Sequence, residues 1–253
     1  MKVSWLAKNV RPDLAYSALK LSQKSQQLPT IGDLKSINKL VKKIKGRTSE
    51  IVYTKVGDSV DLVVYGIGDA SHKRGEKSVG GEVVLLGHKN RDTAVAVYWK
   101  SKTIKNVCKS PKDAETRNIS QLVDNARYIA NQIGFVLFGK KGKNAIPVKI
   151  FTDSLPLLES IASIHRVEEK LMQDWVDFLK EKLESREVNQ YSWLDSDDML
   201  ADMLTKDMKE TNDMLEILWR NKFRLYDNSD NLVTFKKNEF CISNRKLKNN
   251  AIQ

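Results

Sequence analysis

Three runs of β-forming residues lie close together in the first half of the chain and limit the folds open to it. They cover residues 61–67, 82–86 and 93–99, and Val, Leu, Ile and aromatic residues dominate them. Glycines and charged residues separate the runs, which indicates short connections between antiparallel strands. Directly afterwards, over 113–134, apolar residues recur every three or four positions, as on one face of an α-helix. The pattern predicts an antiparallel meander packed against a long helix.

The rest of the chain continues with shorter elements. The predicted elements are strands over 148–151 and 188–194, helices over 155–163, 167–183 and 198–206, and two earlier helices over 11–26 and 30–46. From the first β run onward the order is βββαβαβα. This order predicts an α/β fold with a mixed five-stranded sheet, an N-terminal helical segment and a C-terminal extension.

Three parts of the chain follow from these elements. Residues 1–50 form the helical segment, 58–208 the α/β domain, and 209–253 a C-terminal helix, marked by apolar residues over 214–225, with a loosely ordered basic tail.

Composition narrows the class of protein. The 253 residues carry 43 Lys and Arg against 32 Asp and Glu, a net charge of +11 that favours a polyanionic partner. Only Cys108 and Cys241 occur, without a Cys-x-x-Cys, so neither a disulfide framework nor a zinc site is indicated. No apolar run approaches the ~20 residues of a membrane span, and a secretory signal is lacking. We expect no membrane contact and a reducing compartment, cytoplasmic or nuclear.

Four carboxylates fall at the ends of predicted elements. Asp69 comes late in the first strand, Glu115 early in the long helix, Asp153 at the end of the fourth strand and Asp202 on the late helix. Clustered carboxylates need a cation to stay ionised, and their hard oxygen atoms favour Mg²⁺ or Mn²⁺. Two such ions about 4 Å apart support phosphodiester hydrolysis. Taken singly, each acid has a structural alternative, as a helix cap, a turn residue or an exposed helix charge.

Several short motifs resemble one family. Residues 6–15, Leu-Ala-Lys-Asn-Val-Arg-Pro-Asp-Leu-Ala, and 43–46, Lys-Ile-Lys-Gly, are similar to the end of the reverse transcriptase in copia-type (Pseudoviridae) retrotransposon Pol polyproteins. Residues 69–72, 99–102 and 111–116 are similar to the family's Asp-Ala-Asp-Trp, Trp-x-Ser-Lys and Ser-Thr-Glu-Ala-Glu-Tyr. Residues 150–153 match its Ile-Tyr-x-Asp, and 200–206, Leu-Ala-Asp-Met-Leu-Thr-Lys, are the most specific match.

The resemblance implies a ribonuclease H domain behind a reverse transcriptase tail. It implies that Asp69, Glu115, Asp153 and Asp202 hold two Mg²⁺ or Mn²⁺ ions and that the RNA strand of an RNA/DNA hybrid is hydrolysed. It also implies a reverse transcriptase domain, in cis or in trans, as a partner. The polymerase motif Tyr-x-Asp-Asp is absent, so no polymerisation is expected from these residues.

Neighbours of the acids depart from the family pattern. Ser71 and His72 replace its second Asp and its Trp, and Thr116 replaces a Tyr. A family His before the late helix aligns with Leu171, and His165 is the nearby candidate substitute. These departures bear on substrate placement and turnover more than on metal binding.

Basic residues near the motifs are candidate contacts to phosphates. The set comprises Lys73, Arg74, Lys100, Lys102, Lys105 and Arg117. A solubilising role is equally open for each of them, as it is for the lysine-rich face over 35–45.

Two alternatives remain at this level. The altered neighbours favour a domesticated module with a ribonuclease H-like fold that binds nucleic acid or a protein without turnover. A transposase or integrase core fits less well, because Glu115 precedes Asp153 in the chain.

Overall fold

The computed structural model describes most of the chain. The described residues are 2–24, 28, 30–46, 51–72, 75–89, 91–139, 144–165, 167, 170–208, 220, 231–236 and 239–244. The apolar stretch predicted as a helix over 214–225 lies outside them, apart from Arg220. Within the described part, no helix has the length and apolar character needed to cross a bilayer.

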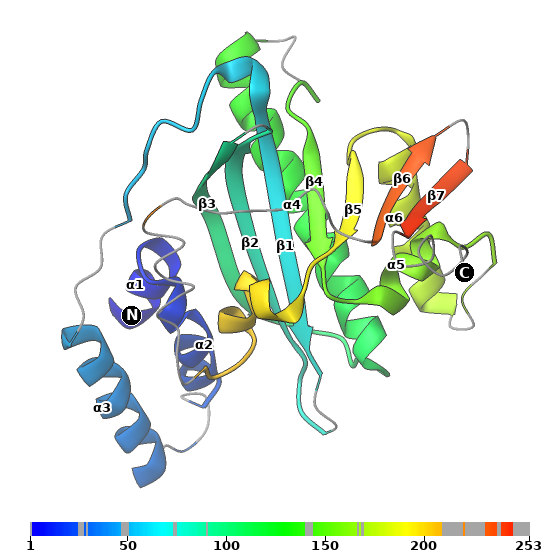
Figure 1. Ribbon diagram of the computed structural model, residues 1–253. Coiled ribbons are helices and arrows are strands. Elements are labelled where there is room, and N and C mark those ends of the chain that lie inside the picture. Colours follow the sequence, from blue (N-terminus) through cyan, green and yellow to red (C-terminus); the bar gives the residue numbers. More distant parts are fainter. Residues whose placement is uncertain are drawn as a thin grey trace, which may run out of the picture.

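A mixed sheet forms the centre of the molecule (Figure 1). The strands are β1 (Leu62–Ser71), β2 (Val79–His88), β3 (Arg91–Thr103), β4 (Val148–Thr152), β5 (Gln190–Trp193), β6 (Asn231–Lys236) and β7 (Glu239–Asn244). Their order across the sheet is β3-β2-β1-β4-β5-β6-β7. β1, β2 and β3 pair antiparallel, which confirms the predicted meander, whereas β4 and β5 run parallel to β1.

Helices cover one face and one edge of this sheet. They are α1 (Lys2–Asn9), α2 (Ala15–Lys24), α3 (Ile31–Lys45), α4 (Pro111–Phe138), α5 (Leu155–Ala162) and α6 (Lys170–Glu184). In Figure 1, α4 lies behind β1, and α1, α2 and α3 lie beyond the edge strand β3. The predicted order of strands and helices is confirmed as far as β5.

Local sequence explains where the helices begin. Thr30 and Asp33 form the predicted capping box at the start of α3, because each side chain accepts a hydrogen bond from the other's backbone. Ser110 caps α4 by accepting from the backbone N–H of Asp113 at 3.1 Å, and Pro111 takes the first turn.

The core has two layers separated by the sheet. Behind it, α4 buries Ile119, Leu122, Val123 and Ala126 against even-numbered residues of β1 such as Val64. In front, odd-numbered residues such as Ile67 pack against buried residues that follow β5. Burial of each large apolar side chain contributes about 1.5–3 kcal/mol. Because β1 buries such side chains on both faces, packing on both sides stabilises it.

The segment in front of the sheet differs from the prediction. The helix predicted over 198–206 is wrong as an α-helix, since the chain forms two 3₁₀ helices, η4 (Ser196–Asp198) and η5 (Leu200–Leu204). With three residues per turn, η5 aligns Leu200 with Met203 against the sheet. Close packing also needs Gly81, where a Cβ would stand 2.7 Å from the backbone oxygen of Ala201.

The sheet is also wider than predicted. The five-stranded sheet is corrected by β6 and β7, a hairpin that pairs antiparallel with β5. The run Leu-Val-Thr-Phe at 232–235 is a short β-forming signal, but it stands in an Asn- and Lys-rich region. β7 therefore enters the stretch that was predicted to be a loose tail.

The N-terminal helices are fastened to the edge of the sheet. The indole Nε1 of Trp99 on β3 donates to the backbone oxygen of Ala7 at 2.8 Å, and Gln23 Nε2 donates to Thr103 Oγ1 at 2.5 Å. Between α1 and α2, Arg11 makes a two-point hydrogen-bonded ion pair with Asp13, and both residues are buried. These contacts fix α1 and α2 relative to β3.

Candidate active site

The strand register brings two of the predicted acids together at the ends of two neighbouring strands. β1 and β4 are parallel neighbours, with Ile67 opposite Phe151. Two residues further on, Asp69 in β1 and Asp153 directly after β4 therefore stand at adjacent strand ends. Glu115 comes from the first turns of α4, and Asp202 comes from η5.

Asp69 lies at the centre of this group. Asp69 is only 4% exposed, and its Oδ2 accepts a hydrogen bond from the Thr205 hydroxyl. Behind it, the amide of Asn118 on α4 donates to the backbone oxygens of Asp69 and Gly81, each at 2.9 Å. The end of β1 is thus tied both to α4 and to the segment after η5.

The other three acids are electrostatically linked to Asp69. The pKa of Glu115 is raised to about 7, first by burial and then by the charges of Asp153 and Asp69, against a lowering hydrogen bond from the Ser154 hydroxyl. Burial and the charge of Asp69 likewise raise the pKa of Asp153. Burial, together with the charge of Asp69 and a hydrogen bond to it, raises the pKa of Asp202 to about 6, against an opposing hydrogen bond from Lys206.

Lys206 is the cation of the cluster. Its Nζ lies 2.8 Å from Asp202 Oδ1 and 3.8 Å from Asp69 Oδ2. Burial lowers the pKa of Lys206, but the hydrogen bond to Asp202 and the charges of Asp69, Asp202 and Asp153 outweigh burial and raise it. One ammonium group faces several carboxylates, so the cluster keeps an excess of negative charge.

Glu115 has an unused oxygen atom. Its Oε2 is buried and has no hydrogen-bond partner, an arrangement that is costly for a carboxylate. The four acids offer only oxygen ligands, which suit Mg²⁺ and Mn²⁺. Among the described residues, no three Asp, Glu, His or Cys side chains stand in positions that already coordinate an ion. The donor set fits a divalent cation, but Lys206 and Thr205 engage Asp202 and Asp69 in this arrangement.

The predicted phosphate contacts divide into three groups. Lys73 and Arg74 lie outside the described residues. Lys102 and Arg117, each with a 12% exposed side chain, are ion-paired with Glu82 and Asp113, so they are committed within the protein. Lys100 and Lys105 are exposed.

Two of the residues that replace family positions make hydrogen bonds to partners other than the four acids. His72 makes its hydrogen bond with Ser78, at 3.1 Å, and the buried Thr116 donates to the Lys112 backbone. His165 is exposed in the segment after α5, where its backbone N–H donates to the Ser163 hydroxyl at 3.0 Å. Lys206, Thr205 and Asn118 were missed as site residues, although the first two end the motif at 200–206.

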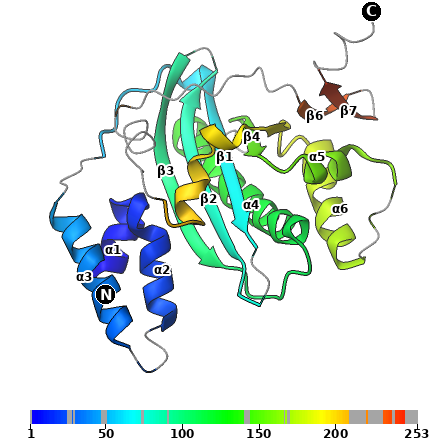
Figure 2. The ribbon, with the colours of Figure 1, turned by 60° about the horizontal axis from the view of Figure 1, so that its bottom comes forward.

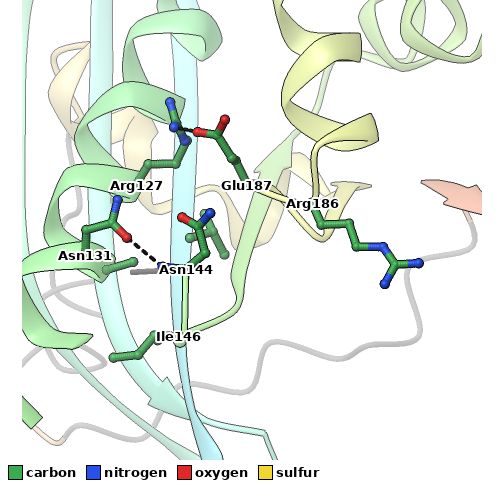
Figure 3. Close-up of a pocket in the computed structure, with 8 residues that line it drawn as sticks. Arg127, Asn131, Asn144, Ile146, Arg186 and Glu187 are labelled. Atoms are coloured by element: carbon green, nitrogen blue, oxygen red, sulfur yellow. Dashed lines mark hydrogen bonds and ion pairs between the residues drawn. The ribbon is translucent and has the colours of Figure 1, made fainter. Parts of the chain in front are cut away.

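A small cavity beside α4 is lined by charged and polar side chains. Figure 3 shows Arg127 on α4 paired with Glu187, beside Asn131 and Asn144. The cavity has a volume of about 10 Å³, which is room for no more than one water molecule. The ion pair therefore ties α4 to the turn after α6.

The fold and the acidic cluster together define a class. Three antiparallel strands, two parallel strands added at β1, a long helix behind and acids at the ends of β1 and β4 make a ribonuclease H-like α/β fold. The fold class predicted from the sequence is confirmed.

Comparison with known proteins adds relatives in sequence. The chain is 25% identical over 207 residues to the retrovirus-related Pol polyprotein from transposon RE1 of Arabidopsis thaliana, covering 79% of this chain and 13% of that protein. It is 27% identical over 122 residues to the corresponding RE2 polyprotein of the same plant, covering 48% of this chain and 8% of that protein. The chain thus spans a small fraction of these relatives. No family model matches it. The resemblance to a copia-type retrotransposon Pol polyprotein, predicted from the motifs, is confirmed by these matches.

Two solved structures are more distant. The N-terminal ribonuclease H domain of a Mycobacterium tuberculosis protein superposes with a TM-score of 0.43 at 14% identity, covering 63% of this chain and 97% of that chain. A ribonuclease H1 in complex with an RNA/DNA hybrid, LC11-RNase H1, gives a TM-score of 0.38 at 14% identity, covering 56% and 92%.

Proposed function

We propose that this chain is a ribonuclease H that hydrolyses the RNA strand of RNA/DNA hybrids. The observation that carries the proposal is the convergence of Glu115, Asp153 and Asp202 on Asp69, with a buried oxygen of Glu115 left without a partner. A structural cluster would pair its acceptors, whereas a cation site keeps one open. The sequence relatives are retrotransposon Pol polyproteins, in keeping with a hybrid substrate.

Asp69, Glu115, Asp153 and Asp202 would hold two Mg²⁺ or Mn²⁺ ions. Bound there, the ions would favour ionisation of an attacking water and neutralise charge on the leaving oxygen. Both ions would replace the charge that Lys206 now supplies, so Lys206 must withdraw from Asp202 when the site fills.

The remaining residues orient the carboxylates. The Thr205 hydroxyl fixes one oxygen of Asp69 and leaves the other available. Ser196 donates to Asp153 Oδ2 at 3.4 Å. Asn118 holds the backbone of Asp69 against α4. These contacts restrict the rotation of acids that must face a common point.

Substrate contacts follow from the exposed lysines. Lys100 and Lys105 are free of the ion pairs that hold Lys102 and Arg117, so they remain as predicted phosphate contacts. Recognition of 2′-hydroxyls would distinguish the RNA strand from DNA.

The domain assignment completes the proposal. Residues 1–50 are proposed to be the end of a reverse transcriptase that acts in cis or in trans, residues 58–208 the nuclease, and 209–253 an extension. An intracellular location, cytoplasmic or nuclear, remains part of the same prediction.

Cleavage of a labelled RNA/DNA hybrid tests the function. With Mg²⁺ or Mn²⁺ we expect fragments with 3′-hydroxyl and 5′-phosphate ends, and no cleavage of the DNA strand or of duplex DNA. Addition of EDTA and the variant Asp153→Asn should each stop the reaction, because EDTA removes the cations and the substitution removes one of their carboxylate ligands. Cleavage of the hybrid by wild type at no more than the rate of Asp153→Asn in either metal would reject the proposal.

A second candidate is a binding module without turnover. The ion pair between Lys206 and Asp202 favours it, because a lysine that stays in place excludes divalent ions. In that case the chain binds the hybrid in the same assay and leaves it intact.

A further inference from the structure

A groove runs between the N-terminal helices and the edge of the sheet. It is bounded by α1 and α2 on one side and by β3 on the other, and its volume is about 850 Å³. Figure 2 shows α1 and α2 alongside the sheet on its β3 side. The hydrogen bonds from Trp99 to Ala7 and from Gln23 to Thr103 join the two walls. The groove therefore belongs to the fixed part of the fold.

The lining of this groove is basic. Lys8 comes from α1, and Lys100 and Lys102 come from β3, while none of the described Asp and Glu residues lines it. Lys8 and Lys100 are exposed, and neither forms an ion pair with a carboxylate of the described residues. Lys102 is balanced by the fully buried Glu82. Lys8 and Lys100 thus line the groove on two different walls, each without an ion-pair partner among the described residues.

Neutral side chains of the lining suit a sugar–phosphate chain. Ser4 on α1 and Tyr53, which is 63% exposed, also line the groove, and each carries a hydroxyl group. Hydroxyl groups donate to phosphate oxygens, and tyrosine also offers a flat face to a sugar or base. An acidic protein surface would pair with the lysines but would make less use of these groups.

The groove lies at the level of the acidic cluster. Asp69 on β1 is opposite Gly81 on β2, and Gly81 is opposite Ser101 on β3. With strands about 4.8 Å apart, Ser101 stands about 10 Å from Asp69 along the sheet. At 3.4 Å per nucleotide along one strand, this corresponds to about three base pairs. A duplex cut at the acids would reach the groove within the same helical turn.

We propose that this groove holds the sugar–phosphate backbone of the hybrid, about three base pairs from the cleaved phosphate. This inference rests on the proposed function and adds a second contact that involves the N-terminal helices. Lys8 on α1 and Lys100 on β3 contact phosphates of this nucleic-acid backbone. The helical segment over 1–50 is then part of the substrate site as well as a packing unit.

Equilibrium binding of a hybrid to the full chain in EDTA separates binding from cleavage. We compare wild type with the double variant Lys8→Ala/Lys100→Ala by fluorescence anisotropy over a range of salt concentrations. The expected result is a Kd weakened at least about tenfold and a salt slope smaller by about 1.5–2, because each lysine releases about one counterion. The control is Lys89→Ala, an exposed lysine at the far end of β2, which should bind as wild type does. Equal melting temperatures show that all variants are folded.

The outcomes separate this inference from the function beneath it. If wild type cleaves the hybrid but the double variant keeps the wild-type Kd and salt slope, the groove proposal is wrong and the nuclease stands. If wild type neither binds nor cleaves the hybrid, the proposed function fails, and the groove proposal falls with it. If the double variant loses binding to polyglutamate but not to the hybrid, the occupant is an acidic protein and the proposal is likewise overturned.

Discussion

Replacing Asp69 with Asn is expected to abolish hybrid cleavage while leaving the metal-free protein at least as stable as wild type. Asn has the same shape, and its side-chain oxygen still accepts the hydrogen bond from Thr205. After burial, however, the lost charge is one of the causes that raise the pKa values of Glu115, Asp153 and Asp202. Cation binding worth several kcal/mol of transition-state stabilisation corresponds to a rate loss of at least about 100-fold. Relief of repulsion should raise the free energy of unfolding at about pH 8 by about 1 kcal/mol.

Two measurements check this pair of effects. Cleavage rates and denaturant unfolding in EDTA are recorded for Asp69→Asn and for the control Asp197→Asn, an exposed acid in η4. The control should match wild type in both. A large drop in stability of Asp69→Asn in EDTA would mean that the acid has a structural role, and near-normal cleavage would contradict its place in the site.

The metal-free protein is expected to lose stability as the pH rises from about 5 to about 8. Glu115 has a pKa of about 7 and Asp202 of about 6 in the folded protein, both above their unfolded values. The folded state therefore binds these protons more tightly. Stability from this source is complete below the unfolded pKa values and is lost as the pH rises through the folded ones. After allowance for partial exposure and for coupling, the loss is about 2–3 kcal/mol.

Other groups can also change the stability between pH 5 and pH 8. The contribution of Glu115 is therefore measured as the difference in pH dependence between wild type and a variant that lacks this carboxyl group. Unfolding free energies in EDTA are compared between wild type and Glu115→Gln at the two pH values. The variant should lose about half of the pH dependence, whereas Glu159→Gln, which changes an exposed acid on α5, should keep all of it. An identical pH dependence in wild type and Glu115→Gln would show that Glu115 titrates normally.

Most of the fold could be predicted because its signals are local. The long helix was recognised from the spacing of Ile119, Leu122 and Ala126, and α4 extends it at both ends to include its Ser110 cap. The 3₁₀ form of η5 could not be predicted, because it depends on how closely Gly81 lets that segment approach β2. β6 was missed because its pairing with β5 crosses about 40 residues of chain, and no local pattern encodes such a partner.

The site residues also divide into those with a local sequence signal and those that depend on contacts in the folded chain. Asp69, Glu115 and Asp153 could be proposed because each lies near the end of an element, a position visible in the sequence, and Asp202 because it lies on the predicted late helix. The contacts of Lys206 could not be predicted from the sequence, because they depend on distances to Asp202 and Asp69 that only the folded chain sets. The same holds for Lys102, whose burial against Glu82 removes it from the candidate phosphate contacts.

The central claim is that Asp69, Glu115, Asp153 and Asp202 act together as one site for divalent cations. Titration of the purified chain with Mn²⁺ at about pH 8, with free Mn²⁺ followed by electron paramagnetic resonance, measures this without reference to activity. We expect about two bound ions in wild type and a loss of that binding in Asp69→Asn. Wild type that binds no Mn²⁺ at millimolar concentration, or that binds no more than Asp69→Asn, would contradict it.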